Sequence, residues 1–394
     1  MPWKETCAVE ERIKFIKDYR SGEFMLAELC RMYGISRKTG YKWIERADQY
    51  GLKGLSDCSR APHHHPNAVS EELVDLILAL RGKHPSWGPK KLRRILERGH
   101  GGFKLPCHST IGEIIRRHGL SVPRRRRRRC EPSSRPFSEC AAPNQVWCAD
   151  FKGWFKTGDG RRVDPLTISD AASRYIIRCQ AMSSVSLEAV QRLFEASFRE
   201  YGMPLVIRTD NGPPFASHGI GGLTRLSVWW IRLGISPERI EPGKPYQNGR
   251  HERMHLTLKK ETASPPRRNL HAQQRAFDRF REEFNHQRPH EALGQETPSS
   301  VYEPSPNQYP SRLPAVEYAD TMVTRKVQKR GEFHWRGHKI FLTEALAGQV
   351  VGLDPIDDRY FDIYLVKVPV GVFDSKRLLA MRRKKRKTDH VRLS

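Results

Sequence analysis

Three acidic side chains stand in sequence contexts that an ordinary surface carboxylate does not require. Asp150 interrupts an otherwise apolar, strand-like segment, Asp210 follows a second such segment and opens an Asp-Asn-Gly turn, and Glu252 lies in a segment with helical character. A carboxylate buried in a strand is costly unless it is paired or binds a cation. Mg²⁺ takes oxygen ligands and commonly uses one or two carboxylates. These residue types therefore suit a site for divalent cations.

Each acid also has an ordinary structural interpretation. The Asp-Asn-Gly sequence at 210–212 could form a hairpin turn, because Asn-Gly favours one. The two prolines that follow oppose a continuing hairpin, since proline cannot donate to the strand ladder. Glu252 could be a helix-surface glutamate paired with a neighbouring arginine. Asp164 or Asp170 could replace Asp150, although both are better explained as turn formers.

The segments around the three acids resemble the integrase-type catalytic core shared by bacterial insertion-sequence transposases and retroviral integrases. This is the DDE superfamily, which has an RNase H-like fold. Residues 284–294, Phe-Asn-His-Gln-Arg-Pro-His-Glu-Ala-Leu-Gly, followed by Thr297-Pro298, are similar to the segment that closes this core. The resemblance covers most of the chain, and its combination of segments is specific although each one alone is weak.

The resemblance implies Asp150, Asp210 and Glu252 as the catalytic triad and the metal ligands. The interval between Asp210 and Glu252 is somewhat longer than the spacing that is commonest in the family, which a local insertion could explain. Glu241 and Glu261 therefore stay open as alternatives for the third acid.

Paired divalent cations about 3.5–4 Å apart can activate the attacking oxygen of a phosphodiester reaction and stabilise the leaving oxygen. We expect two Mg²⁺ ions, with Mn²⁺ as a substitute, bridged by Asp150 and completed by Asp210 and Glu252. Water would first release a 3′-OH at the end of a mobile element, and this 3′-OH would then attack target DNA. Lys259 follows Glu252 by two helical turns on the same face and could contact the phosphate beside the scissile bond, or be a surface lysine.

The charge of the chain favours a nucleic-acid partner. Seventy Lys and Arg against 44 Asp and Glu give a formal net charge of +26, and such an excess attracts polyanions. A basic solvated surface, or RNA binding of the ribosomal kind, is the alternative. The eight Cys residues include no Cys-x-x-Cys pair, which argues against a zinc ribbon or redox pair. With neither a signal-peptide pattern nor an apolar run long enough to span a membrane, we expect a cytoplasmic, nucleoid-associated bacterial protein.

Residues 10–47 predict three short helices. Ser36 could cap the third helix, over 37–46, with Tyr41 and Ile44 facing inward. A helix, a glycine-containing turn and a basic helix are typical of a helix-turn-helix, whose last helix enters the major groove; a plain three-helix bundle is the alternative. The expected DNA contacts of this helix are Arg37, Lys38, Thr39, Lys42 and Arg46.

A second helical unit is predicted from three further apolar repeats, and it could lengthen the recognised DNA site. Six consecutive arginines follow it; a block of like charge stays extended unless phosphates neutralise it. We expect this run to track DNA, with a nuclear-import signal as the alternative. The further expected DNA contacts are Arg124, Arg125, Arg126, Arg127, Arg128, Arg129, Lys259 and Lys260.

Alternating strand and helix patterns predict a multidomain protein. It combines all-α helix-turn-helix modules, a central α/β RNase H-like core with a mixed five-stranded sheet and flanking helices, and a small C-terminal β-barrel. The expected boundaries are 1–53 (helix-turn-helix), 54–69 (linker), 70–122 (second helical DNA-binding domain), 123–143 (basic linker), 144–303 (catalytic core), 304–320 (linker), 321–379 (β-barrel) and 380–394 (basic tail).

The sequence therefore predicts a DNA transposase that binds double-stranded DNA at element ends and targets, acts as a homo-oligomer, and has no membrane partner. Two other functions compete with this prediction. One is an inactive, transposase-derived repressor, which need not retain all three acids. The other is a simple metal-dependent nuclease, which would have little use for two DNA-reading units.

Overall fold

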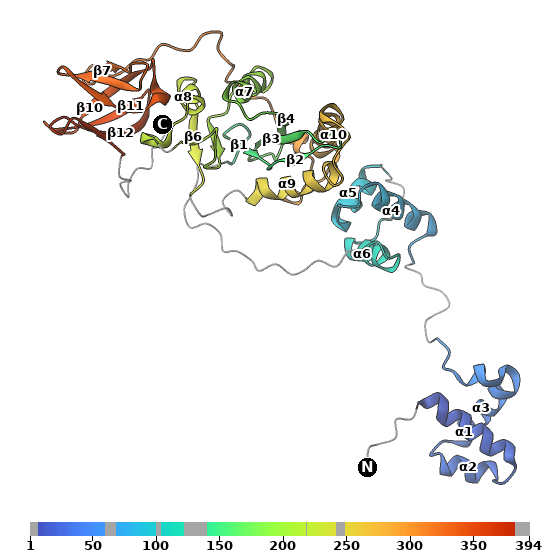
Figure 1. Ribbon diagram of the computed structural model, residues 1–394. Helices are drawn as coiled ribbons and strands as arrows, with labels where there is room; N and C mark the ends of the chain where they lie inside the picture. Colours follow the sequence, from blue (N-terminus) through green and yellow to red (C-terminus); the bar gives the residue numbers. More distant parts are fainter. Residues whose placement is uncertain are drawn as a thin grey trace. The chain divides into compact units, whose positions relative to one another are not determined.

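The computed structural model describes residues 7–59, 68–99, 104–121, 140–217, 219–241 and 249–382. The chain divides into two compact units, Met1–Ser70 and Glu71–Ser394 (Figure 1). The arginine run 124–129 and the basic tail after residue 382 lie outside the described residues. Within the described part, no helix is both long and apolar enough to cross a membrane.

The first unit is helical, as predicted. Its elements are α1 (Ala8–Ser21), α2 (Leu26–Met32), α3 (Arg37–Tyr50) and a 3₁₀ helix (Gly51–Leu55). The Ser36 side chain accepts a hydrogen bond from the Thr39 backbone N–H at 3.1 Å and so caps α3 as expected. The prediction that Tyr41 faces inward is wrong, because its side chain is 62% exposed and Trp43 is buried instead. The face of α3 that packs inward carries Gly40, Trp43 and Ala47, so the helix is rotated from the predicted orientation.

The second unit begins with a helical module of α4 (Glu71–Lys83), α5 (Pro89–Gly99) and α6 (His108–Arg117). Its core includes the fully buried side chains of Ile77, Leu92 and Ile111.

Charged side chains of this module contact the end of the core. Lys90 Nζ lies 2.6 Å from Glu291 Oε1, and both Arg94 and Arg98 donate to Glu296. His84 lies 3.0 Å from Glu283. Part of the basic face of α5 is therefore already paired with acidic groups of the same chain.

The core contains a mixed sheet, which confirms the predicted arrangement. Its strands are β1 (Val146–Phe151), β2 (Phe155–Lys156), β3 (Arg162–Asp170), β4 (Ile176–Met182), β5 (Val206–Thr209) and β6 (Ser236–Arg239). Strand β3 pairs antiparallel with β1 and β4, while β5 pairs in parallel with β1 and β6. The short β2, which the sequence did not predict, pairs with the beginning of β3.

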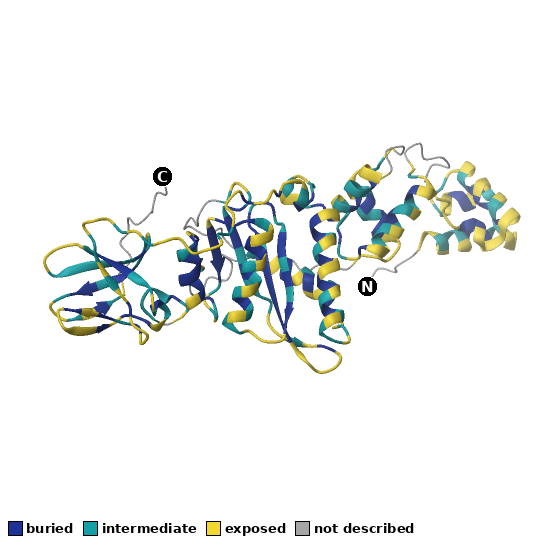
Figure 2. Cartoon of the chain, turned by 90° about the horizontal axis from the view of Figure 1, so that it is seen from above, coloured by how far each residue is buried: buried dark blue, intermediate teal, exposed yellow. Residues whose placement is uncertain are grey.

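Helices cover both faces of this sheet. They are α7 (Leu187–Tyr201), α8 (Arg225–Arg232), α9 (Gly249–Thr262) and α10 (Leu270–Glu282). Helices α7 and α8 pack on one face through a cluster that includes Trp147, Phe194 and Trp230. Helices α9 and α10 pack on the other face, where Met254 and Phe277 are buried. Figure 2 shows the central strands largely buried between these helices.

The C-terminal part is all-β, but the predicted closed barrel is not confirmed. Its strands are β7 (Val323–Lys326), β8 (Glu332–Trp335), β9 (His338–Phe341), β10 (Val350–Pro355), β11 (Tyr360–Leu365), β12 (Val368–Asp374) and β13 (Leu379–Met381). In the part of the chain that the structure describes, five of them form an open sheet with β13 and β7 at its edges, and β8 and β9 form a separate hairpin. Aromatic side chains join the two, since Phe333 and Trp335 lie 5.4 and 5.2 Å from Phe373, measured between ring centroids. The hairpin therefore covers the sheet by packing and does not complete a ring of hydrogen bonds.

Candidate active site

The sheet brings Asp150 and Asp210 to neighbouring positions, although they are far apart in the sequence. Ala149 on β1 pairs with Thr209 on β5 in parallel register. Asp150 and Asp210 are the next residues of these two segments, so both lie at the carboxyl ends of adjacent strands. The Asp150 side chain is 15% exposed, and Asp210 Oδ1 accepts a hydrogen bond from the Gly212 N–H at 3.2 Å. Two carboxylates at one strand edge are a donor set that suits a hard, oxygen-binding cation such as Mg²⁺.

Glu252 is placed differently. It lies in the first turn of α9 with its side chain exposed, as are those of Lys259 and Lys260 nearer the end of the helix. The loop 242–248 before this turn lies outside the described residues. Within the described residues, the three acids do not form a cluster in which every pair of ligand atoms lies within 4.8 Å. The structure thus brings Asp150 and Asp210 to adjacent strand ends, and among the described residues Glu252 does not complete a tight three-acid cluster with them.

Two histidines of α9 approach Asp150 instead. One ligand atom each of Asp150, His251 and His255 lies within 4.8 Å of the others. Both imidazole Nε2 atoms contact the hydroxyl of Thr167 on β3, His251 at 2.7 Å and His255 at 2.6 Å. The same hydroxyl donates to the Asp150 carbonyl oxygen at 3.2 Å. His255 Nδ1 lies 3.9 Å from Asp150 Oδ2.

Burial keeps both histidines neutral at neutral pH. Desolvation lowers the pKa of His251 to about 3. The pKa of His255 falls to about 2, mainly because of desolvation and also because His251 and Lys152 are close. The sequence contained a signal for this burial, because His251 and His255 share the spacing of the apolar Met254 and Leu258 along a helix. Neither histidine was among the site residues predicted from the sequence.

The contacts of these histidines do not resemble a preformed metal site. Imidazole nitrogens suit zinc, copper, iron or nickel, whereas carboxylates and water suit magnesium. The position between the two Nε2 atoms is already filled by the Thr167 hydroxyl. The histidines therefore act as a hydrogen-bonded contact between α9 and β3, and the carboxylates remain the candidate metal ligands.

The alternative third acids lie in distinct places. Thr209 pairs with Arg239 in parallel register, so Ile240 is level with Asp210, and Glu241 lies one residue further along. Glu261 lies near the end of α9 and accepts hydrogen bonds from Ser86 Oγ at 2.5 Å and Arg288 Nη1 at 3.1 Å. Glu261 is thus engaged with the helical module, whereas Glu241 lies near the strand edge that carries the aspartates.

Asp164 and Asp170, the alternatives for Asp150, both belong to β3. Asp164 accepts two hydrogen bonds from Arg162, at 2.7 and 2.8 Å. Asp170 is buried and accepts from the Asn144 N–H at 2.7 Å and from the backbone and hydroxyl of Ser173 at 2.7 and 2.6 Å. These contacts give Asp170 a structural role that ties the turn after β3 to the segment before β1.

Asp170→Ala is expected to lower the midpoint of thermal unfolding of the second unit by roughly 5–10 °C, because three buried donors lose their acceptor. Differential scanning calorimetry would measure this change. Asp278→Ala is the matched control, since Asp278 is exposed on α10. An unchanged midpoint for Asp170→Ala would contradict the structural role.

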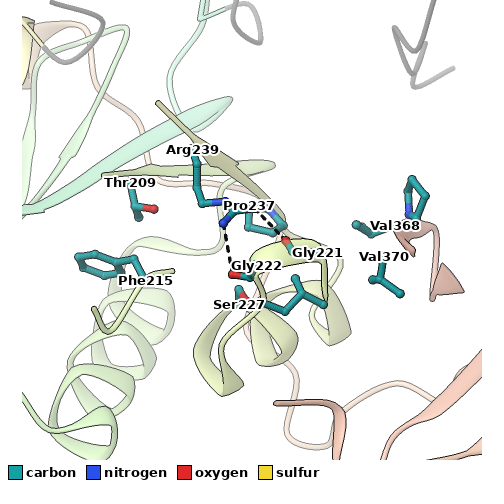
Figure 3. Close-up of a pocket in the computed structure, with 11 residues that line it drawn as sticks. Thr209, Phe215, Gly221, Gly222, Ser227, Pro237, Arg239, Val368 and Val370 are labelled. Atoms are coloured by element: carbon teal, nitrogen blue, oxygen red, sulfur yellow. Dashed lines mark hydrogen bonds between the residues drawn. The ribbon is translucent and has the colours of Figure 1, made fainter. Parts of the chain in front are cut away.

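A pocket lies at the carboxyl end of β5, where Thr209 lines it (Figure 3). Thr209, Phe215 and Arg239 line the side formed by the core. The turn at Gly221 and Gly222 forms a second wall, and Arg239 donates to their carbonyl oxygens at 2.8 and 3.3 Å. Burial and the nearby Arg382 lower the pKa of Arg239. Strand β12 completes the lining, so the all-β C-terminal part and the core share this pocket. Its lining residues are Thr209, Phe215, Gly221, Gly222, Leu223, Ser227, Pro237, Arg239, Val368, Pro369 and Val370.

The predicted DNA-contacting residues of α3 differ in whether their side chains are exposed or already hydrogen-bonded within the protein. Arg37, Lys38 and Lys42 are exposed. The Thr39 hydroxyl lies 2.9 Å from that of Ser36. Arg46 donates to the Ser56 carbonyl oxygen at 2.9 Å and to Cys58. The first three are therefore the more available for phosphate or base contacts.

Comparison with protein families gives matches along the chain. A helix-turn-helix domain matches residues 11–63, and a homeodomain-like domain matches 39–115. Integrase core domains match residues 141–245 and 233–298. The two integrase matches together include all three predicted acids.

Two curated relatives are proteins of insertion elements. The chain is 29% identical over 272 residues to the insertion element IS407 uncharacterized 31.7 kDa protein of Burkholderia multivorans, covering 68% of this chain and 87% of the relative. It is 27% identical over 255 residues to the insertion element IS476 uncharacterized 39.2 kDa protein of Xanthomonas euvesicatoria. This match covers 62% of this chain and 69% of the relative.

Solved structures give weaker similarities. The HTLV-2 integrase catalytic core domain, in complex with magnesium, aligns at a TM-score of 0.32 and 16% identity over 41% of this chain and 99% of that one. A chain of the simian T-cell lymphotropic virus intasome, solved in complex with a PP2A regulatory subunit, aligns at a TM-score of 0.36 and 16% identity. The alignment covers 75% of this chain and 97% of that one. The integrase core domains, the helix-turn-helix domains and the insertion-element relatives together support a DDE transposase of a bacterial insertion sequence.

Proposed function

We propose that this protein is an active transposase that binds the ends of its element and joins them to target DNA. Asp150, Asp210 and Glu252 would hold two divalent cations. The observation that supports this proposal most is the parallel register of β1 and β5, which sets two carboxylates at adjacent strand ends inside an integrase core domain. Carboxylates at such an edge are suited to phosphodiester chemistry with metal ions.

In this proposal the protein mainly positions its substrates. When bound, Mg²⁺, or Mn²⁺ in its place, supplies positive charge where the phosphodiester gains negative charge. Asp150, Asp210 and Glu252 would hold the ions, and Lys259 would contact the adjacent phosphate. Water attacks the phosphorus at the element end, and the bond to the 3′ oxygen breaks to leave a 3′-OH. That 3′-OH then attacks a target phosphorus and displaces another 3′ oxygen.

The proposed domains divide the work. Residues 1–53 and 70–122 would read the element ends, 123–143 would track DNA through its arginines, and 144–303 would carry the chemistry. The part from 321 to 379 would add a basic surface. Because two ends must be joined together, we expect the protein to act as a homo-oligomer on double-stranded DNA. Its setting would be the bacterial cytoplasm, at the nucleoid.

A single assay separates this function from its alternatives. Purified protein is incubated with Mg²⁺ or Mn²⁺, labelled element-end DNA and a target plasmid. Joined products support transposition, cleavage without joining supports a nuclease, and binding without either supports a repressor. Omitting the divalent ion is the control for metal dependence.

Replacing Lys42 by alanine should weaken binding to element-end DNA, because its exposed ammonium is placed on the third helix of the helix-turn-helix. If Lys42 contacts a phosphate, the slope of log K against log salt should fall by about one unit. Fluorescence anisotropy over a salt series would measure both quantities. Lys17→Ala is the matched control, since Lys17 is exposed on α1 of the same unit. Equal effects of the two substitutions would contradict a specific role for α3.

A further inference from the structure

The Thr167 hydroxyl links three groups that the proposed chemistry must keep in place. It contacts His251 and His255 of α9, and it donates to the backbone of Asp150 on β1. We call Thr167, His251 and His255 together the Thr167 bridge. All three side chains of the bridge are buried, with relative exposures of 0% for Thr167, 3% for His251 and 5% for His255. A polar cluster excluded from water at this depth is stable only when its hydrogen bonds are satisfied.

Only one arrangement of hydrogens satisfies all the contacts of the bridge. The Asp150 carbonyl can only accept, so the single hydroxyl hydrogen of Thr167 goes to it. Both imidazoles must then donate from Nε2 to the two lone pairs of the hydroxyl oxygen. This leaves both Nδ1 atoms as acceptors: that of His251 lies 3.2 Å from the Ser169 hydroxyl, which donates to it. The Nδ1 lone pair of His255 faces Asp150 Oδ2 at 3.9 Å and disfavours a closer approach of that oxygen.

The bridge also anchors the part of α9 that carries Glu252. The later turns of the helix are held by apolar packing of Met254 and Leu258. The first turn lacks such packing within the described residues, and His251 is its buried anchor. First turns fray readily because their N–H groups have no partner within the helix. Losing the contacts of His251 would therefore free the first turn, which carries Glu252, while the rest of α9 stays packed.

We propose that Thr167, His251 and His255 are positioning residues, which fix the first turn of α9 relative to Asp150 and so set where Glu252 can meet the two aspartates. This inference rests on the proposed function, because it assigns the bridge to the third metal ligand. Catalytic groups need to be held within about 0.5 Å of their working geometry, and residues that orient metal ligands commonly contribute 10–100-fold to metal affinity or activity. The buried bonds of Thr167 between β3, β1 and α9 are the contacts that would restrict this segment.

Thr167→Val tests the bridge, because it keeps the shape of the side chain and removes the hydroxyl. Hydrogen–deuterium exchange of the free protein, without metal or DNA, should become at least about tenfold faster in peptides covering residues 249–255 and stay unchanged in those covering 258–262. The Mg²⁺ concentration that half-saturates strand joining should rise about tenfold. Binding of element-end DNA in EDTA should be unaffected.

Three variants make the result specific. Thr167→Ser retains the hydroxyl and should restore both readouts to near wild type. Thr257→Val removes a hydroxyl from another face of α9, where Thr257 bonds within the helix to Arg253, and should change neither. Ser169→Ala removes only the bond to His251 Nδ1 and gives a smaller change in the same direction, which keeps the test available if Thr167→Val does not fold.

The outcomes separate the positioning role from the proposed function. If wild-type protein joins no DNA with any divalent ion, the transposase proposal fails, but exchange in the 249–255 segment still reports on the bridge. If Thr167→Val, or Ser169→Ala in its place, folds and shows the exchange and the Mg²⁺ dependence of wild type, the positioning role is overturned.

Discussion

Asp150→Ala and Asp210→Ala are each expected to reduce strand joining by on the order of 10³-fold or more, with binding to element-end DNA almost unchanged. The two carboxylates end adjacent parallel strands, so the loss of either would leave the cations with too few oxygen ligands. DNA recognition is expected to depend on the helical modules and basic residues elsewhere. A plasmid joining assay with radiolabelled ends measures the first quantity, and anisotropy in EDTA measures the second.

Asp164→Asn is the matched control for these two variants. Asp164 lies in the same sheet and its carboxylate bonds to Arg162. Asparagine keeps the size of this buried side chain and one acceptor oxygen for Arg162, so the replacement should leave joining within about threefold of wild type. Wild-type joining by either aspartate variant would remove that residue from the site. Loss of joining in Asp164→Asn alone would instead identify Asp164 as the first acid.

Glu252→Gln is expected to cause a loss of similar size, on the order of 10³-fold, although Glu252 is exposed in the first turn of α9. Glutamine keeps the length of the side chain and one acceptor oxygen and removes the charge. A metal ligand should therefore lose its function, whereas a glutamate of the helix surface should not. Joining at saturating DNA, over a Mg²⁺ series, measures the effect.

Glu241→Gln is the decisive comparison for the third acid. Glu241 lies one residue beyond the line of Asp150, Asp210 and Ile240 at the strand edge. If Glu252 is the third ligand, Glu241→Gln should join DNA at nearly the wild-type rate. The reverse pattern would move the triad to Glu241 and would remove the two-turn relation that connects Lys259 to the site.

The joining and binding results for the acid variants also distinguish the transposase from the alternative functions. A transposase-derived repressor would bind DNA in every variant and join it in none, including wild type. A nuclease would lose cleavage with the aspartates but never yield joined products. Loss of activity in the acid variants would therefore show that the protein is an enzyme, and the presence of joined products would distinguish a transposase from a nuclease.

The sequence itself determined the elements that carry the site. Strand-like patterns at 146–151, 163–169 and 205–208 and a helical pattern at 248–261 predicted β1, β3, β5 and α9 close to their observed bounds. Local propensity and burial pattern agree in these segments. The acid within an apolar strand already indicated an unusual position at Asp150. The helix-turn-helix and the integrase core were predicted from the same local patterns and are confirmed by the family matches.

Other features depended on contacts between distant segments. Which face of α3 packs inward was decided by the close approach of Gly40 to α2, where an added Cβ would lie 2.7 Å from Cys30 Sγ. The absence of barrel closure among the described strands depended on how the β8–β9 hairpin packs, which alternation along single strands does not specify.

The candidate site shows the same division. Residue types and local spacing determined which carboxylates could bind a cation, since that chemistry belongs to the side chains themselves. Only the tertiary structure decided that Asp150 and Asp210 end adjacent strands, and that His251 and His255 meet the Thr167 hydroxyl. The physical reason is that strand register and the docking of α9 on the sheet arise from burial summed over the whole core, which no short segment of sequence contains.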